Sequence, residues 1–198
     1  MADKDRVLGY LAEHDGVVLA DDVRRLGLST RALERLVHSG QLERVARGLY
    51  IDADRMEDSF LVAQYRCPSG IFSMDSALYL HRMTDRNPTR LVMTILSGTH
   101  PRVRSQIDLY RFFYLKPELW QLGKTSVLTP SGNSVTVYDP ERTICDCIRR
   151  IDELDRDEVL TAVKRYMKDP RARLQELLDY AEAFHIRDTV RQYMEVLR

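Results

Sequence analysis

Three acidic side chains near residue 140 are of the type that can hold a metal ion. Asp139, Glu141 and Asp146 lie where a predicted strand ending at Tyr138 passes into a predicted helix, and clustered carboxylates can support metal-assisted chemistry. A nuclease site of this kind also needs a basic member, but no Glu-x-Lys follows a strand anywhere in the chain. Helix initiation is sufficient to explain these residue types. Asp139 can cap the helix, Pro140 suits its first turn, and Glu141 is stabilised by the positive end of the helix dipole.

The remaining reactive side chains form no catalytic or metal-binding pattern. The five histidines follow neither an HExxH nor an HxxxH spacing, and we expect His81 to be a buried, hydrogen-bonded side chain. Cys145 and Cys147 are two apart on a predicted helix and therefore point to different faces. Together with Cys67 they are interpreted as small buried hydrophobic residues. We expect no enzymatic activity, no metal and no cofactor.

Residues 1–55 predict three short helices followed by a β-hairpin. In chain order we expect helices at about 4–14, 20–26 and 30–39 and strands at 42–45 and 49–51. Ser29 can cap the third helix, and Arg47-Gly48 places a glycine in the hairpin turn, where a positive φ is required. This order is typical of a winged helix-turn-helix domain, whose third helix enters the major groove of DNA.

The side chains of the third helix divide into an apolar stripe and a basic face. At about 100° per residue, Leu33 and Leu36 fall on one side, and Arg31, Arg35 and His38 lie opposite them. An arginine fork can bond guanine edges or phosphates at two points, and arginines of the hairpin can reach phosphates. The predicted DNA-binding residues are Ser29, Thr30, Arg31, Arg35, His38, Arg44 and Arg47. The alternatives are a merely solvated helix surface and a protein-interaction module.

The formal net charge of zero hides a separation of charge within this domain. Over the 198 residues, 30 basic side chains balance 30 acidic ones. Residues 24–47 hold six arginines against two glutamates, a net charge of +4, whereas residues 1–23 hold two basic and six acidic side chains, a net charge of −4. The basic part coincides with the third helix and the hairpin, as phosphate binding requires.

Residues 56–65 are predicted to be helical, and from Pro68 onward the pattern changes to a mixture of strands and helices. After Asp139-Pro140 the chain is predicted to be helical to its end. We therefore expect an α+β fold with three parts: a winged helix-turn-helix over residues 1–55, a connecting helix and linker over 56–70, and a mixed α/β domain with a helical C-terminal bundle over 71–198.

A second basic stretch lies at a helix–helix junction in the C-terminal part. Its members are Lys164, Arg165, Lys168, Arg171 and Arg173, with Asp169 as the only acid between them. One interpretation is a solvated surface balanced by the acidic run at 152–158. The other is a basic surface that contacts RNA, DNA or an acidic protein.

Nothing in the sequence predicts a membrane or exported protein. No stretch approaches 18 consecutive apolar residues, the length needed to span a bilayer. The charged N-terminus lacks the apolar segment of a secretory signal, and three cysteines without a framework spacing fit a reducing compartment. We expect a cytoplasmic protein without a membrane partner.

Several segments, taken in order, resemble AbiEi-type antitoxins of type IV, or abortive-infection, toxin–antitoxin systems. The segment Arg47–Tyr50 closes the hairpin as in that family, and Ser73–His81 is similar to the helix that opens its second domain. The segment Tyr138–Asp146 resembles its strand-to-helix junction, so the resemblance spans about residues 4–165.

The resemblance implies a DNA-binding antitoxin that represses its own operon. The winged helix would bind inverted repeats in double-stranded promoter DNA. The C-terminal domain would counteract a toxin similar to nucleotidyltransferases, and in the type IV description the two proteins need not touch. The alternative is a transcriptional regulator or a protein-interaction module without a cognate toxin.

Overall fold

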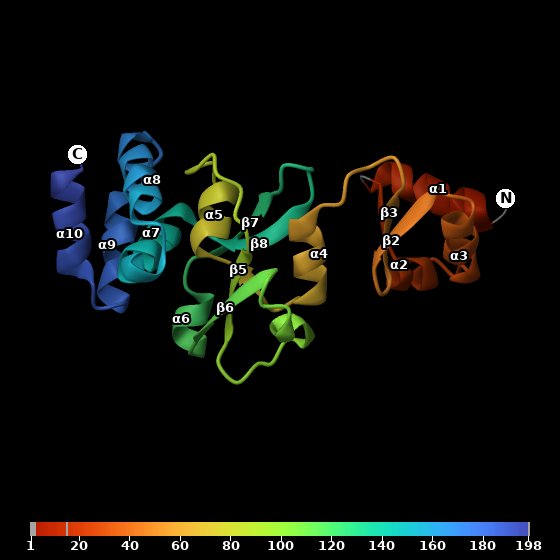
Figure 1. The fold of residues 1–198 in the computed structure, drawn as a ribbon, viewed down its shortest axis with the longest axis horizontal. Helices are drawn as coiled ribbons and strands as arrows, with labels where there is room; N and C mark the ends of the chain where they lie inside the picture. The colour runs from red at the N-terminus through yellow and green to blue at the C-terminus, as the bar shows by residue number, and fades with distance from the viewer. Residues whose placement is uncertain (1–2, 15, 198) are drawn as a thin grey trace. The chain divides into compact units, whose positions relative to one another are not determined.

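The computed structural model describes residues 3–14 and 16–197, which divide into two compact units (Figure 1). The first unit runs to Arg66 and includes residues 131–133, and the second holds the remainder of the described chain. Both units combine helices with a β-sheet, so the predicted α+β class is confirmed.

The first unit contains helices and an antiparallel sheet of strand order β1-β3-β2. Its elements are α1 (Asp3–Glu13), β1 (Val17–Leu19), α2 (Ala20–Arg25), α3 (Arg31–His38), β2 (Leu42–Ala46), β3 (Leu49–Asp52) and α4 (Ser59–Arg66). The hairpin predicted around Arg47-Gly48 is formed by β2 and β3. Gly48 has a φ of 84°, a left-handed conformation that glycine adopts without a steric cost.

The core of the first unit fixes which face of α3 points outward. Leu33 and Leu36 of α3 are fully buried, and they share one cluster with Val7 and Leu11 of α1 and Val23 of α2. The apolar stripe predicted for the third helix is therefore confirmed. Its burial leaves the opposite side of α3 exposed to solvent.

The second unit contains a mixed sheet of strand order β6-β5-β4-β8-β7. Its first elements are β4 (Ile71–Phe72), α5 (Met74–Leu80), β5 (Leu91–Leu96), η1 (Arg102–Ser105), β6 (Tyr110–Leu115), α6 (Pro117–Gln121), β7 (Lys124–Leu128) and β8 (Ser134–Tyr138). The helical end follows as α7 (Pro140–Arg149), η2 (Ile151–Glu153), α8 (Arg156–Lys168), α9 (Leu174–Ala183) and α10 (Arg187–Val196). β4 pairs antiparallel with β5 and parallel with β8.

The helices at the C-terminal end share a core with the sheet. α7 packs against α5, α8 and α9, and every side chain from Glu141 to Ile148 is buried. One apolar cluster extends from Val92 of β5 through Ile144 of α7 to Val190 of α10. The predicted helical bundle thus shares one hydrophobic core with the sheet and belongs to the same domain. Within the described residues, no helix combines the length and apolarity needed to cross a bilayer.

Some local details were not predicted from the sequence. The helices at the C-terminal end are interrupted between Lys168 and Leu174, because the Asp169 carboxylate accepts the backbone N–H of Arg171 at 2.9 Å and closes a turn there. α6 was not predicted, although Pro117 occupies its first turn, where proline is favoured.

Candidate functional site

The exposed face of α3 brings three of the predicted DNA-binding residues together. Arg31, Arg35 and His38 line one shallow hollow of about 510 Å³, together with Glu34, and all four are exposed. The spacing of four and seven residues places the predicted trio on one side of the helix. Glu34 was missed as a site residue, although helical periodicity places it next to His38. A carboxylate there repels phosphate but can accept a hydrogen bond from a cytosine amino group.

Hydrogen bonds at the start of α3 involve the two predicted hydroxyl residues differently. Thr30 occupies the N-cap position without a side-chain capping bond. The Ser29 hydroxyl instead accepts the backbone N–H of Arg31 at 3.3 Å, and the Ser29 N–H donates to the Asp3 carboxylate at 3.2 Å. The predicted cap therefore lies one residue outside the helix. A hydroxyl that accepts a hydrogen bond keeps its own proton for a phosphate.

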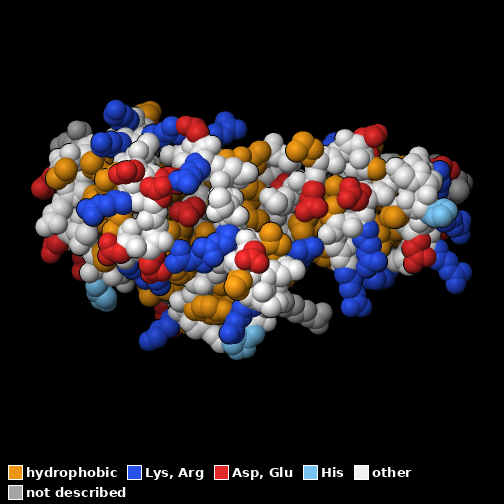
Figure 2. Space-filling view, in the orientation of Figure 1, with side chains coloured by type: hydrophobic (Ala, Val, Ile, Leu, Met, Phe, Trp, Pro, Cys, Tyr) orange, Lys and Arg blue, Asp and Glu red, His pale blue; other side chains and the backbone are white. Residues whose placement is uncertain are grey.

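The hairpin carries the two arginines that were predicted to reach phosphates. Arg44 lies opposite Tyr50 in the β2–β3 register, with its guanidinium carbon 6.0 Å from the centre of the tyrosine ring. Arg47 lies in the turn, and its carbonyl accepts the Tyr65 hydroxyl at 3.3 Å. Both arginine side chains are exposed. Figure 2 shows basic side chains over the part of the first unit that holds α3 and this hairpin.

Two of the six arginines in the basic stretch are neutralised within their own helix. Arg24 forms an ion pair with Asp21, and the Arg25 Nη1 lies 3.4 Å from the Asp22 Oδ1. In the described part of the chain, the arginines of α3 and of the hairpin have no such ion pair. Among the arginines of residues 24–47, those of α3 and of the hairpin are therefore the unpaired ones.

The acidic side chains considered for metal chemistry are tied to protein partners at the start of α7. Asp139 caps α7 by accepting the Arg142 backbone N–H at 2.8 Å, and it also accepts the Tyr180 hydroxyl at 2.9 Å. Glu141 accepts the Tyr166 hydroxyl at 2.9 Å and pairs with Arg173. Among the described residues, no group of three His, Cys, Asp or Glu side chains could hold a metal ion.

Burial and hydrogen bonding compete at these two carboxylates, and the net shifts of their pKa values have opposite directions. Burial raises the pKa of Asp139, and the capping bond from Arg142 offsets this only in part. Burial also pushes the pKa of Glu141 upward, but the hydrogen bonds from Arg173 and Tyr166 outweigh it and hold the pKa below its usual value. Glu141 is therefore a charged partner of Arg173 at neutral pH.

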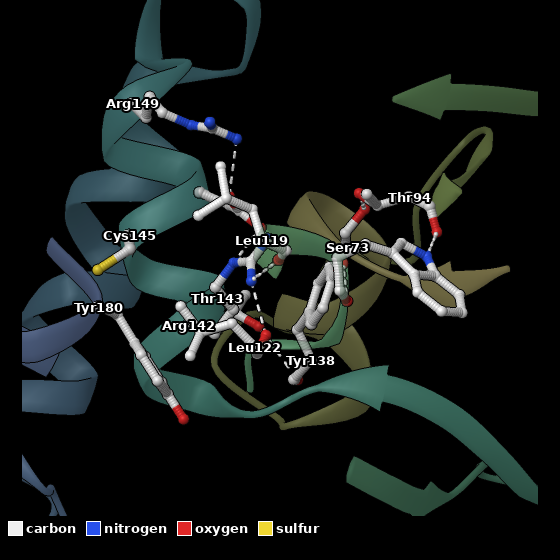
Figure 3. Close-up of polar contacts among 12 residues, drawn as sticks. Ser73, Thr94, Leu119, Leu122, Tyr138, Arg142, Thr143, Cys145, Arg149 and Tyr180 are labelled. Atoms are coloured by element: carbon white, nitrogen blue, oxygen red, sulfur yellow. Dashed lines mark hydrogen bonds and ion pairs between the residues drawn. The ribbon is translucent and has the colours of Figure 1, made fainter. Parts of the chain in front are cut away.

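Arg142 is a fully buried cation that joins α6 to α7. Its Nη1 donates to the carbonyls of Leu119 and Leu122 at 2.7 and 2.6 Å, and its Nε donates to Asp146 at 3.0 Å (Figure 3). The guanidinium carbon also lies 4.0 Å from the centre of the Tyr138 ring. A buried charge needs such partners to offset the loss of water. The motif around residue 140 is thus used for structure.

Three of the five residues of the predicted basic antitoxin surface (Lys164, Arg165, Lys168, Arg171 and Arg173) form ion pairs, two of them with acids from distant parts of the chain. Arg171 pairs with Asp169, as the sequence allows. Arg165 pairs with Asp85 and Arg173 with Glu141, Glu176 and Asp139. Lys164 and Lys168 of α8 are exposed and form no ion pair among the residues that the structure describes. Asp169 is the only acid between these basic residues in the sequence, but folding brings Asp85, Asp139 and Glu141 into contact with them.

Residues 5–51 match the family of transcriptional regulators described as AbiEi antitoxins. The expected resemblance to AbiEi-type antitoxins is thus confirmed for this stretch, and over residues 52–165 it stays a prediction. No curated protein matches the chain. The crystal structure of the RV2827C protein from Mycobacterium tuberculosis has a similar fold, with a TM-score of 0.62. It is 13% identical to this chain, and the alignment covers 98% of this chain and 80% of that protein.

Proposed function

We propose, from the match of residues 5–51 to AbiEi antitoxin regulators, that this protein is a cytoplasmic DNA-binding antitoxin that represses its own operon. The observation that carries the proposal is the exposed face of α3, where Arg31, Arg35 and His38 meet in one hollow. The unpaired arginines of the adjoining hairpin support it, because phosphate binding needs cations that no carboxylate has neutralised.

Each element of this surface has a distinct role in the proposed complex. α3 enters the major groove, where Arg31 and Arg35 bond base edges or phosphates through their planar forks. Arg44 and Arg47 on the hairpin bind phosphates and fix the orientation of the domain. Inverted repeats in the promoter would seat one copy of the domain on each half-site.

The test compares two double variants in promoter-binding measurements. Arg31→Ala with Arg35→Ala removes the two cations of the α3 face, and each lost contact is expected to reduce affinity about 10- to 100-fold. Arg24→Ala with Arg25→Ala removes the same formal charge from ion-paired positions and is expected to leave affinity within about threefold of the wild type. Circular dichroism establishes that both variants are folded. Promoter binding by the first variant equal to that of the wild type contradicts the proposed interface.

The antitoxin part of the proposal concerns the second unit. We propose that its basic antitoxin surface counteracts a toxin similar to nucleotidyltransferases in an abortive-infection system, with or without direct contact. The support is the antitoxin description of the matching family together with the exposed, unpaired lysines of α8. The alternative is a transcriptional regulator without a cognate toxin, and a growth-rescue assay with the toxin gene distinguishes the two.

Charge reversal on α8 tests this role in cells that express the neighbouring toxin gene. Lys164→Glu with Lys168→Glu is expected to abolish growth rescue, because the contact surface changes sign. The matched control, Arg90→Glu with Arg191→Glu, changes exposed arginines elsewhere in the second unit and is expected to rescue growth fully. Full rescue by the α8 variant would show that this face does not act against the toxin.

A further inference from the structure

A pocket of about 670 Å³ opens in the second unit, where α5 ends and α7 begins. Its walls come from the end of α5, from β7, from the first turn of α7 and from the α8–α9 junction. This volume lies within the range of about 300–1,000 Å³ that is usual for small-molecule sites. Neither the DNA-binding proposal nor the exposed lysines of α8 use this pocket.

The charged side chains that line the pocket leave an excess of positive charge. They are Arg82, Arg165, Arg171 and Arg173 against Glu141 and Asp169. His81 also lines the pocket, and burial lowers its pKa, so it adds no charge at neutral pH. Arg165 is paired with Asp85 and Arg173 with Glu141, Glu176 and Asp139. The charge left for an anion therefore comes from Arg82 and Arg171, whose planar guanidinium forks match the geometry of phosphate.

One wall of the pocket is fixed by a buried carboxylate that is itself neutralised. Glu141 is only 2% exposed, and its Oε2 lies 2.5 Å from the Arg173 Nη2. The other oxygen, Oε1, accepts the Tyr166 hydroxyl at 2.9 Å and the Arg173 backbone N–H at 3.1 Å. Because these donors satisfy it, Glu141 does not present an uncompensated negative charge to an anion.

Two arginines remain available to a ligand. Arg82 is exposed and forms no ion pair within the described part of the chain. Arg171 is 88% exposed, and its one ion-pair partner among the described residues is Asp169, at 2.8 Å. An ion pair in such contact with water is weak, so a doubly charged phosphate can take the place of the carboxylate.

The pocket is also lined by apolar side chains. Leu80, Met83, Val127 and Leu128 contribute to it, and Leu128 is 64% exposed. Apolar lining beside a few convergent charged groups is the usual composition of a small-molecule site. We propose that this pocket binds a small phosphate monoester, with the phosphate between Arg82 and Arg171 and the apolar body on Leu128.

Titration calorimetry on the full-length protein tests the proposal with three probes. AMP and glucose 6-phosphate carry the phosphate monoester on different bodies, whereas adenosine lacks the phosphate. We expect one of the two esters to bind with a Kd of about 1 mM or tighter, and adenosine to bind at least about tenfold more weakly. Tighter binding of AMP supports an aromatic, less polar body on Leu128, whereas tighter binding of glucose 6-phosphate, whose body is polar, overturns that part of the proposal.

Variants then locate the binding site. Arg82→Ala and Arg171→Ala are each expected to weaken binding of the better ester about tenfold, and Leu128→Ser is expected to weaken it as well. Arg90→Ala removes an exposed arginine outside the pocket and is expected to change nothing. The proposal is overturned if neither ester binds saturably up to about 10 mM, or if Arg82→Ala and Arg171→Ala bind as tightly as the wild type. Promoter binding is expected to be unchanged in every pocket variant, so the test is independent of the DNA-binding proposal.

Discussion

His81 shows how the surroundings of one side chain set its charge. Its Nε2 lies 2.6 Å from the Tyr138 carbonyl oxygen, and a carbonyl can only accept, so Nε2 carries a proton. Burial lowers the pKa of the ring, and the hydrogen bond to Tyr138 offsets this only in part. The folded protein therefore holds a neutral imidazole under conditions in which the unfolded chain binds a proton.

This difference predicts a pH dependence of stability. Because the pKa of His81 is lower in the folded state, the unfolded chain binds more protons as the pH falls through about 6.5, and the free energy of unfolding decreases. His81→Gln keeps a donor for Tyr138 but does not titrate. Urea denaturation of the variant is expected to show a shallower loss of stability between about pH 7 and pH 5 than the wild type. An unchanged slope would contradict the assignment.

Single residues on one helix face are predictable from the sequence, but pairs made by folding are not. Helical periodicity alone placed Arg31 and Arg35 together, opposite the core. The pairing of Arg165 with Asp85 joins residues 80 positions apart, and that of Arg173 with Glu141 joins residues 32 apart. No local pattern encodes such contacts, so the basic antitoxin surface seemed less compensated in the sequence than it is in space.

At the scale of the elements, the junction between β7 and α6 depends on one glycine. Gly123 has a φ of 74°, which a residue with a side chain adopts only at a cost. A Cβ at this position would lie 2.6 Å from the Arg142 Cβ, and Arg142 is fully buried. The backbone and the packing therefore both require glycine here.

Gly123→Ala is accordingly expected to lower the free energy of unfolding by about 2–4 kcal/mol. The matched control is Gly98→Ala, because Gly98 has a φ of 88° but open space around its Cα, and it is expected to cost about 1 kcal/mol. Urea denaturation followed by the fluorescence of Trp120, the single tryptophan, measures both variants. Equal losses would mean that the contact with Arg142 adds nothing.

Elements of the chain were predictable where their patterns are long or have clear ends. The hairpin at Gly48 and the helix that begins after Asp139 carry turn and capping signals that the structure confirms. β1 was missed because its three residues run directly into α2 and are too few to show an alternation. Its pairing with β3 depends on a strand about 30 residues later, which no local pattern specifies.

At the scale of the whole molecule, each unit has an apolar cluster of its own among the residues that the structure describes. The cluster around Leu33 belongs to the first unit and the one around Ile144 to the second. The three cysteines are all buried in the second unit. Burial raises the pKa of Cys145 to about 12, and a thiol reacts only as the thiolate. Slow thiol modification therefore reports an intact second unit.

Separate cores predict that damage to one unit spares the other. Leu33→Ala is expected to destabilise the first unit by about 2–5 kcal/mol and to abolish promoter binding, while the thiols stay as unreactive toward a disulfide reagent as in the wild type. Ile144→Ala in the second core is the reciprocal control and is expected to speed thiol modification. Rapid modification of the Leu33 variant would show that the two units unfold as one.

The shortness of β4 has a consequence for how the sheet of the second unit opens. β4 contributes only Ile71 and Phe72, which join β5 through two residue pairs and β8 through one. β5 and β6 pair over six residues, and β7 and β8 over five. The sheet thus consists of two extensively paired parts, β5–β6 and β7–β8, which are joined through the few residue pairs of β4. In native-state hydrogen exchange, we expect the amides that pair β4 with its neighbours to exchange through brief local openings, while those within β5–β6 and within β7–β8 stay protected.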